Sequence, residues 1–344
     1  MTKIKIAING FGRIGRAFLR VAQTRPELEV VAINDLGSVE NLAYLLKYDS
    51  VYGRAPFEVT SRQNADGAGG AIMVEGREIV VLAQKDPALL PWKDLGIDVV
   101  VESTGFFTHF EDAQKHITAG AKRAVISAPG KGDESLGATV LVGVNEDRFG
   151  ICSVTSNASC TTNAASPTIA ILDEAIGIEK AVLSTTHAYT ASQSIVDGPS
   201  KKDVREGRAG AHNIVPTSTG AAIAVTQAYP SLSGKFDGIS LRVPVIAGSI
   251  ADITFIAKRD TSAEEVNDIL KKAATQDRWS AVFATTDEPL VSSDIVGAVH
   301  ASIADLSMTR VVGGNLVKVL AWYDNEMGYT HSLVEHVVRL AAHI

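Results

Sequence analysis

The sequence contains very little cysteine: Cys152 and Cys160 are its only two among 344 residues. Two cysteines without the paired spacing of zinc ligands exclude a disulfide-based scaffold and indicate no metal site, so a reducing cytoplasm is the expected compartment. No apolar run reaches the roughly 18 residues of a membrane-spanning helix. The first residues, MTKIKIAING, have no apolar signal-peptide core and are expected to form a strand.

Positive charge is also scarce. The 32 lysines and arginines are outnumbered by 39 acidic residues, and the formal net charge is −7. This balance disfavours nucleic-acid binding but is compatible with a local basic pocket. The hydrophobic fraction of 46% is typical of a folded protein, and the length allows two domains with a large core.

Near the N-terminus a glycine pattern follows a predicted strand. Residues 4–8 (IKIAI) lead into Gly10, Gly12 and Gly15, and RAFLRVAQ then has helical spacing. In this strand–turn–helix context G-x-G-x-x-G indicates dinucleotide binding, because the glycines permit a tight turn, close approach of a pyrophosphate and packing of helix on strand. The helix N-terminus offers N–H groups to the phosphates. A glycine turn that serves packing alone is the alternative.

An acidic residue ends the next predicted strand. Asp35 closes LEVVAIND, 20 residues after Gly15. A carboxylate at this position can accept hydrogen bonds from both ribose hydroxyls of the adenosine, and it would repel a 2′-phosphate. The sequence therefore predicts NAD as the cofactor in preference to NADP.

The rest of the first half alternates predicted strands with helical segments. Strands are expected at 98–104, 123–129 and 139–145, with a helix at 111–122. This alternation is typical of a parallel, doubly wound sheet. Ser103, Thr104 and Ser127 would stand at strand ends, where such sheets bind ligands. We expect an α/β protein whose residues 1–158 form a dinucleotide-binding Rossmann domain.

The second half has a different pattern. Long strands are expected at 181–189, 239–246, 249–259 and 315–324, with few helices between them. This pattern favours an α+β catalytic domain with a mixed or antiparallel sheet over residues 159–324. The C-terminal segment has the apolar spacing of an amphipathic helix. We expect this helix, within residues 325–344, to complete the first domain.

Cys160 lies in the stretch SNASCTTNA, among small, hydroxylated and amide side chains. A helix is expected to begin at or just after it, and a helix N-terminus lowers the pKa of a cysteine, more so beside a histidine. Cys160 is therefore interpreted as reactive, with a buried structural cysteine as the alternative. Near a nicotinamide, such a thiol suggests aldehyde oxidation through a covalent adduct. Of eight histidines, His187 is one possible base, and spacing alone does not select it.

Six motifs, in this order and spacing, resemble those of glyceraldehyde-3-phosphate dehydrogenases: NGFGRIGR, SNASCTTN, STTHAYT, VPTSTGAA, LRVP and WYDNEMGY. The resemblance covers essentially the whole chain. It implies oxidation and phosphorylation of D-glyceraldehyde 3-phosphate to 1,3-bisphosphoglycerate with reduction of NAD, as in glycolysis and gluconeogenesis. It also implies a cytoplasmic homotetramer in which residues 190–211 form a loop that lines a neighbour's cofactor pocket.

The resemblance gives two residues a role in catalysis. Cys160 is implied to be the nucleophile, which forms a hemithioacetal and then a thioacyl (thioester) enzyme that inorganic phosphate cleaves. His187, 27 residues later, is implied to activate the thiol, to act as base and to help hold the oxyanion with the N–H of Cys160. The accompanying hypothesis is that a protonated His187 stabilises the thiolate of Cys160.

The same resemblance implies the binding residues. The phosphate of the substrate is expected at Thr190 and Arg242, and the attacking phosphate at Ser159, Thr161, Thr219 and Gly220, with Arg205 close by. The cofactor is expected to contact Gly10, Gly12, Arg13, Ile14, Gly15, Asp35, Lys85, Ser127 and Asn325, the last through the nicotinamide amide. Arginine forks and hydroxyl or N–H donors are the groups that bind phosphate dianions.

The chain departs from the common pattern of that family in four places. Ala164 replaces a second cysteine in the same helix, which bears on redox regulation and not on the chemistry. Ile223 stands in place of a lysine, Lys85 in place of an arginine, and VIAGSIAD (245–252) in place of TPNVSVVD. Lysine keeps the charge of arginine but loses its fork of donors.

Two other functions remain as alternatives. Erythrose-4-phosphate dehydrogenases share SNASCTTN, but tend to lack the Thr-Gly pair matched here by Thr219 and Gly220, and the threonine matched by Thr190. A non-catalytic binding protein on the same fold is the second alternative. The presence of both Cys160 and His187 counts against it, although a moonlighting role could coexist with catalysis.

Overall fold

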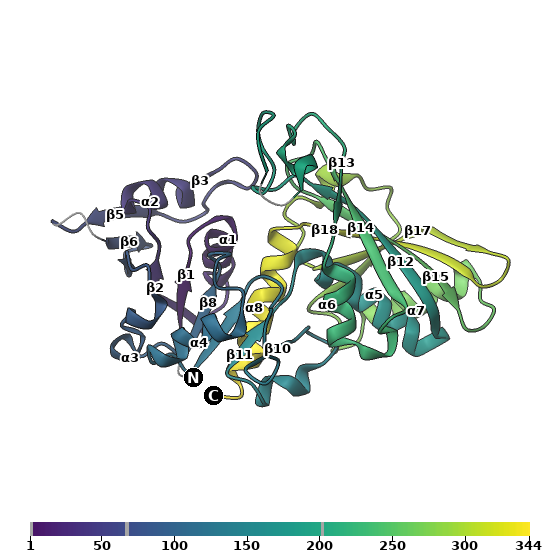
Figure 1. Cartoon of the computed structure of the whole chain (residues 1–344), viewed down its shortest axis with the longest axis horizontal. Coiled ribbons are helices and arrows are strands. Elements are labelled where there is room, and N and C mark those ends of the chain that lie inside the picture. The colour runs from purple at the N-terminus through teal and green to yellow at the C-terminus, as the bar shows by residue number, and fades with distance from the viewer. Residues whose placement is uncertain (1–2, 66–68, 201–202) are drawn as a thin grey trace. The chain divides into compact units, whose positions relative to one another are not determined.

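The computed structural model describes residues 3–65, 69–200 and 203–344. Contacts between Cα atoms divide the chain into two compact units, each built on a sheet of its own (Figure 1). The first unit comprises residues 1–140, 146–158 and 333–344, and the second comprises residues 141–145 and 159–332. Each unit is therefore described separately.

The first unit contains a nine-stranded, mostly parallel sheet. The strands from β10 to β7 pair in parallel, whereas β6 and β5 add an antiparallel edge. The order is β10 (Gly137–Thr139), β11 (Val154–Ser156), β9 (Arg123–Ile126), β8 (Val99–Glu102), β1 (Ile4–Asn9), β2 (Leu28–Asn34), β7 (Arg77–Leu82), β6 (Gly70–Val74) and β5 (Val59–Gln63). The short strands β3 (Tyr48–Asp49) and β4 (Gly53–Arg54) form a separate hairpin.

Helices connect the parallel strands of the first unit. They are α1 (Arg13–Ala22), α2 (Val39–Lys47), α3 (Trp92–Leu95) and α4 (Phe110–Thr118), with 3₁₀ turns at Pro87–Leu89 and Glu146–Gly150. Strand β8 is buried along its whole length, as expected of a parallel strand covered on both faces. Trp92 and Phe110 pack with Val100 and Ala124 in one apolar cluster, which binds helices α3 and α4 to the sheet.

The second unit contains a seven-stranded mixed sheet. The pairs β14–β12 and β16–β17 are parallel, and the other neighbours are antiparallel. The order is β13 (Val215–Ser218), β14 (Phe236–Val243), β12 (Ile178–Ala188), β15 (Ser249–Ala257), β18 (Leu316–Tyr323), β17 (Ser302–Val312) and β16 (Phe283–Thr286). With the parallel first sheet, this mixed sheet confirms the predicted fold class.

The helices α5 (Cys160–Ile176), α6 (Ala221–Ala228) and α7 (Ala263–Ala274) pack on this sheet (Figure 1). Along β15 buried and half-buried residues alternate, so one face of the strand meets the helices. Ile169 and Leu172 of α5 pack there with Phe255 and Val319 in a single core. Ser262 caps α7 by accepting the N–H of Glu265 at 3.2 Å, which is the spacing of a capping box.

Two predicted elements differ in the structure. The strand expected at 139–145 ends at Thr139, because Gly143 adopts φ +82° and Asn145 Oδ1 accepts the N–H of Leu141 at 2.9 Å, which makes a turn. The C-terminal helix α8 spans Met327–Ala341, and its part from Leu333 is counted with the first unit. In the segment 190–211, Lys201 and Lys202 lie outside the described residues, and the rest includes a 3₁₀ turn at Val204–Gly207.

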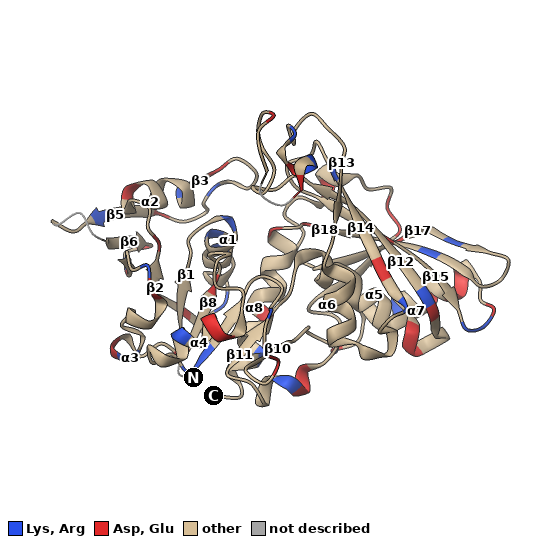
Figure 2. Cartoon of the chain, viewed as in Figure 1, with Lys and Arg blue, Asp and Glu red and all other residues tan. Residues whose placement is uncertain are grey.

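Acidic and basic side chains are interspersed on both units (Figure 2). For example, Lys318 of β18 donates a hydrogen bond to Asp252 of the neighbouring strand β15. Within residues 3–65, 69–200 and 203–344, none of the helices combines the length and the apolar character needed to cross a membrane.

A fully buried histidine connects α8 with β11 in the first unit. His336 Nδ1 lies 3.2 Å from Asn157 Oδ1, and Nε2 lies 2.8 Å from the hydroxyl of Thr155. The edge of the imidazole meets the ring of Phe149, with centroids 4.7 Å apart. Because the amide oxygen only accepts, the neutral imidazole carries its proton on Nδ1. Burial lowers the pKa of His336 to about 3.

We predict that His336 makes the fold acid-sensitive. In the unfolded chain a histidine has a pKa near 6.5, so below that pH the unfolded state binds a proton that the folded state does not. The stability that His336 contributes is therefore complete above pH 6.5 and falls by about 1.4 kcal/mol per unit of pH below it, about 2 kcal/mol at pH 5. Denaturant unfolding of the wild type and His336→Gln at pH 7.5 and 5 measures this.

The variant is expected to be less stable at pH 7.5 but to lose less stability on acidification. The exposed His212 gives a matched control, since His212→Gln should keep the wild-type pH dependence. Equal losses for the wild type and His336→Gln would contradict the assignment.

Candidate active site

The turn between β1 and α1 has the backbone that the glycine pattern predicts. Gly10 adopts φ +92°, and a Cβ there would lie 2.6 Å from the N atom of Thr104. A Cβ on Gly15 would lie 2.2 Å from the carbonyl oxygen of Gly10, so the helix could not approach the strand as closely. By contrast, a Cβ on Gly12 would meet nothing within 4 Å. The backbone at Gly12, which caps α1, is therefore open to a ligand.

A cavity of about 580 Å³ lies in the first unit beside this turn. Asp35 is fixed in its wall, because its two carboxylate oxygens accept the N–H groups of Phe11 at 2.7 Å and Gly37 at 2.8 Å. The cavity is lined by Asn9, Gly10, Gly12, Asn34, Asp35, Leu36, Gln84, Lys85, Ser103, Thr104, Phe106 and Phe107. Its size suits a small-molecule ligand, and the open backbone and fixed carboxylate fit a dinucleotide.

The other predicted cofactor residues lie outside this lining. Arg13 and Ile14 occupy the first turn of α1 with Gly15 close behind, and the side chain of Arg13 forms an ion pair with Asp49 at 2.9 Å. Ser127 directly follows β9, and Asn325 belongs to the second unit. The guanidinium of Arg13 is thus engaged by Asp49, and contacts of Arg13 and Ile14 with the cofactor stay a prediction.

Sequence reasoning missed two buried amides in the cavity wall. Asn34 donates to Asn9 Oδ1 at 2.7 Å, and Asn9 donates to the carboxylate of the buried Glu102 at 2.5 Å. Both asparagines end buried strands, β1 and β2. A polar residue at the end of an apolar strand is a pattern that indicates a ligand-binding position. The pattern was applied above to Asp35 but not to Asn9 and Asn34.

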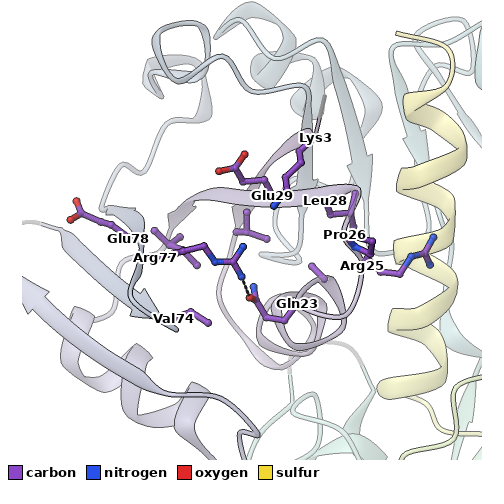
Figure 3. Close-up of a pocket in the computed structure, with 12 residues that line it drawn as sticks. Lys3, Gln23, Arg25, Pro26, Leu28, Glu29, Val74, Arg77 and Glu78 are labelled. Carbon is purple, nitrogen blue, oxygen red and sulfur yellow. Dashed lines mark hydrogen bonds between the residues drawn. The ribbon is translucent and has the colours of Figure 1, made fainter. Parts of the chain in front are cut away.

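A smaller cavity of about 80 Å³ lies between α1, β2 and the β6–β7 hairpin (Figure 3). Arg77 and Arg25 stand at its rim, but both are already engaged by protein groups. Arg77 donates to Gln23 Oε1 at 2.5 Å, and Arg25 pairs with Glu27 and Glu335. This cavity therefore presents no free convergent set of donors and is not a candidate site.

In the second unit, Cys160 is the first residue of α5. Ala158 adopts the left-handed φ of 54°, and Ser159 then caps the helix by accepting the N–H of Thr162 at 3.1 Å. The hydroxyl of Thr161 lies 2.9 Å from that of Tyr323. The sulfur of Cys160 is thus held at a helix N-terminus among hydroxyl groups, where N–H groups and the helix dipole favour negative charge.

His187 lies against this sulfur. Its Nε2 is 3.3 Å from Cys160 Sγ, and its ring meets the ring of Tyr323 edge-on. Parallel pairing of β12 with β14 places His187 directly beside Arg242, and Arg242 Nη1 lies 2.7 Å from His187 Nδ1. Spacing in the sequence does not distinguish His187 from the other seven histidines. The structure does, because the register of β12 brings His187 to Cys160.

One ring nitrogen of His187 has two competing partners. Besides Arg242, the carbonyl oxygen of Ala188 lies 2.6 Å from Nδ1. A guanidinium only donates and a carbonyl only accepts, so Nδ1 can satisfy one of them at a time. When Nδ1 donates to Ala188, Nε2 is left as an acceptor for the thiol proton. When Nδ1 accepts from Arg242, Nε2 carries the proton and donates to the sulfur.

The electrostatics of this pair correct the expectation of a lowered thiol pKa. Burial raises the pKa of Cys160, although the charge of Arg242 and the N–H of Thr161 oppose the shift. Burial, and then the charge of Arg242, lower the pKa of His187 to about 3. Burial therefore favours an uncharged imidazole at neutral pH, in place of the protonated His187 of the sequence-based hypothesis. The sequence showed neither the depth of burial nor the neighbouring arginine.

The other phosphate-binding candidates are distributed over three segments. Thr190 follows β12, and its hydroxyl contacts that of Ser192 at 3.0 Å. Thr219 accepts the N–H of Ala221 at 3.2 Å, and Gly220 caps α6 with open space around its Cα. Both are placed at a helix N-terminus, a favourable position for an anion.

Arg205 is paired with a neighbouring carboxylate. It forms a two-pronged ion pair with Asp203, through Nε at 3.1 Å and Nη2 at 2.8 Å. Within the described residues it makes no hydrogen bond to Ser159, Thr161 or Thr219. A contact of Arg205 with the attacking phosphate stays a prediction, and the carboxylate of Asp203, two residues away, would compete for its guanidinium.

Comparisons with known proteins agree with this geometry. Residues 4–110 match the family model of the NAD-binding domain of glyceraldehyde 3-phosphate dehydrogenase, and residues 159–325 match that of its C-terminal domain. The chain is 47% identical over 341 residues to a glyceraldehyde-3-phosphate dehydrogenase of Zymomonas mobilis, covering 98% of both chains. It is 46% identical to one of Geobacillus stearothermophilus over 99% of this chain and 98% of the relative, and 46% identical to glyceraldehyde-3-phosphate dehydrogenase 1 of Kluyveromyces lactis over 97% and 99%.

These matches confirm the resemblance seen in the motifs, the prediction of NAD as cofactor and the prediction of an oxidoreductase, and they do not favour the erythrose-4-phosphate alternative. The NAD-binding match contains the glycine turn and Asp35, and the C-terminal match contains Cys160 and His187. The chain belongs to the glyceraldehyde-3-phosphate dehydrogenase family of NAD-dependent oxidoreductases.

Proposed function

We propose that this protein oxidises D-glyceraldehyde 3-phosphate and phosphorylates the product with inorganic phosphate, giving 1,3-bisphosphoglycerate and NADH. The observation that carries the proposal is the 3.3 Å contact between Cys160 Sγ and His187 Nε2 at the start of α5. A thiol beside a neutral imidazole has both a nucleophile and a base. Family membership indicates the substrate class. The cavity beside the glycine turn and the carboxylate of Asp35, both in the first unit, support NAD as the cofactor.

The proposed chemistry proceeds through a thioester on Cys160. The sulfur adds to the aldehyde carbon while His187 Nε2 takes the thiol proton, and the backbone N–H of Cys160, at the start of α5, would stabilise the oxyanion. His187 returns this proton to the oxygen, which gives the hemithioacetal, and then removes it again as the C–H bond breaks. NAD, when bound, accepts the hydride and so supplies the oxidation. A phosphate oxygen finally attacks the thioester carbon, the C–S bond breaks and the thiolate leaves.

Substrate binding would set the proton position on His187. In the structure Arg242 contacts His187 Nδ1 at 2.7 Å. A dianionic phosphate is a stronger partner for a guanidinium than a neutral imidazole is, so the substrate's phosphate, held by Arg242 and Thr190, draws Arg242 from the ring. Nδ1 then donates to Ala188, and Nε2 becomes the acceptor that the base role requires.

The attacking phosphate is assigned to Ser159, Thr161, Thr219 and Gly220. Support comes from the two helix N-termini at which they lie, since α5 begins at Cys160 and α6 at Ala221. Arg205 contributes only if it exchanges Asp203 for the phosphate, because in the structure it is fully paired with that carboxylate.

We also propose a cytoplasmic homotetramer, and that the two compact units act as the cofactor domain and the catalytic domain. The outer face of the second sheet supports assembly. Val182, Ile239, Val312 and Leu316 share this face by register and expose 60, 52, 63 and 42% of their surface. Exposed large apolar side chains are typical of a subunit interface, and the ion pair of Lys318 with Asp252 lies on the same face. In the segment 190–211, Ile195 and Val196 are also exposed.

The function is tested by NADH formation from glyceraldehyde 3-phosphate, with NAD or NADP and with or without inorganic phosphate. Turnover is expected to require phosphate and to prefer NAD, since a 2′-phosphate would face Asp35. Faster, phosphate-independent oxidation of erythrose 4-phosphate would show that the alternative substrate is the right one. Comparable kcat/KM for NAD and NADP would contradict the role of Asp35.

Replacing the nucleophile should abolish turnover. Cys160→Ser is expected to reduce kcat by several orders of magnitude while NAD binding stays intact, because a hydroxyl is un-ionised at neutral pH and far less nucleophilic than a thiol. Steady-state NADH formation and calorimetric NAD binding measure the two effects. Cys152→Ser, which removes the other, buried cysteine, serves as the control and should retain activity. Activity of Cys160→Ser within tenfold of the wild type would rule out Cys160 as the nucleophile.

The two phosphate sites should separate by mutation. Arg242→Leu is expected to raise the KM for the aldehyde most, and Thr219→Ala the KM for inorganic phosphate. A hydrogen bond to a charged group contributes about 1.5–3 kcal/mol, roughly a 10- to 150-fold effect. Thr226→Ala is a control in α6, since that hydroxyl bonds only the carbonyl of Ile223. Equal changes of both constants in both variants would indicate a single shared anion site.

A further inference from the structure

Ser249, the first residue of β15, is a buried serine with partners on two other segments. Its Oγ accepts the backbone N–H of Ala188 at 3.1 Å and lies 3.1 Å from Oδ1 of Asn325. Ser249 is 1% exposed and Asn325 is 6% exposed. One hydroxyl therefore connects the residue after His187 with the amide of Asn325, and neither contact was foreseen from the sequence.

The direction of each hydrogen bond follows from the groups involved. The N–H of Gly248 donates to the same Asn325 oxygen at 3.2 Å. A backbone N–H only donates, so the atom it faces must be the amide oxygen. The oxygen cannot donate to Ser249, and the serine must therefore donate to it. The hydroxyl of Tyr323 also contacts Ser249, and a serine oxygen has two lone pairs, so it can accept from both Ala188 and Tyr323.

With its oxygen held by two donors, Asn325 is left with its NH₂ group to present. Within the described residues no group accepts a hydrogen bond from Asn325 Nδ2. A ligand group that meets it has to be an acceptor. The carboxamide of nicotinamide offers both an acceptor, its C=O, and a donor, its NH₂, so the orientation of Asn325 decides which of them is recognised.

We propose that Ser249 is a positioning residue that fixes the amide of Asn325 so that it donates to the carboxamide oxygen of the nicotinamide. The proposal rests on the proposed contact of Asn325 with the cofactor. Without the serine hydroxyl, the oxygen keeps only the bond from Gly248, and the amide is free to turn. Because Ser249 also holds the N–H of Ala188, the same hydroxyl keeps the end of β12, and hence His187, in register with Asn325.

Binding of NAD and of ADP-ribose, which lacks the nicotinamide, tests the proposal by calorimetry without any turnover. Ser249→Ala is expected to raise the dissociation constant for NAD about three- to tenfold, the effect of one neutral hydrogen bond, and to leave that for ADP-ribose within twofold. Ser240→Ala is the matched control. Ser240 is a buried serine of the neighbouring β14 whose hydroxyl meets Thr185 instead, and both constants should stay unchanged.

Two further measurements separate the possible failures. Asn325→Ala should weaken NAD but not ADP-ribose, and if it changes neither, the assignment of Asn325 to the nicotinamide is wrong and the role of Ser249 fails with it. If Asn325→Ala weakens NAD and Ser249→Ala does not, or if Ser249→Ala weakens both ligands equally, the positioning role alone is overturned.

The orientation itself is tested on the wild type with 3-acetylpyridine adenine dinucleotide, which keeps the C=O but replaces the NH₂ by a methyl group. Affinity within about threefold of that for NAD is expected, since one acceptor bond is retained. A loss of more than tenfold would mean that the amide oxygen of Asn325 faces the ligand, and would overturn the proposal.

Discussion

The approach of Cys160 to His187 requires that a helix begins where a strand ends. α5 begins at Cys160 because Ser159 caps it, and the apolar residues of α5 pack into the core of the second sheet. His187 lies near the end of β12, and pairing with the neighbouring strands β14 and β15 fixes the register of β12 and so the position of this residue. A shift of β12 by one residue would turn the side chain of His187 to the other face of the sheet. A shift of α5 by one residue would move Cys160 away from the start of the helix. The 3.3 Å contact is therefore a property of the whole second core.

The register of the same sheet gathers the remaining polar groups at one end. His187 pairs with Arg242 on β14, and Ser249 pairs with Tyr323 on β18. These four residues stand on adjacent strands, so their mutual contacts need no flexible loop to hold them. Burial then determines their protonation. Burial lowers the pKa of His187 to about 3 and, aided by Arg242, keeps the imidazole neutral. A neutral ring has a lone pair to accept a proton, and it would become a stronger base once a substrate phosphate draws the charge of Arg242 away.

Local patterns predicted most of the fold and selected Cys160 as the candidate nucleophile. The strand–glycine–helix turn, the strand ending at Asp35 and the helix starting at Cys160 depend on short-range preferences, which the sequence displays directly. The parallel first sheet was predicted from the alternation of strands and helical segments along the chain. Contacts that depend on register between distant strands were not predictable, such as Arg242 beside His187 and Ser249 beside Asn325. The end of β10 at Thr139 also depends on a turn that apolar periodicity hides.

One departure from the usual family pattern acquires a physical reason in this arrangement. The stretch 245–252 has glycine at Gly248, where φ is +87° and a Cβ would lie 2.2 Å from the carbonyl oxygen of Ser292. A side chain would force this backbone outward and move the N–H that reaches Asn325. Since Ser249 directly follows, the same displacement would shift its hydroxyl from Ala188. The absence of a Cβ at Gly248 thus fits the backbone in which two consecutive residues donate to one amide oxygen.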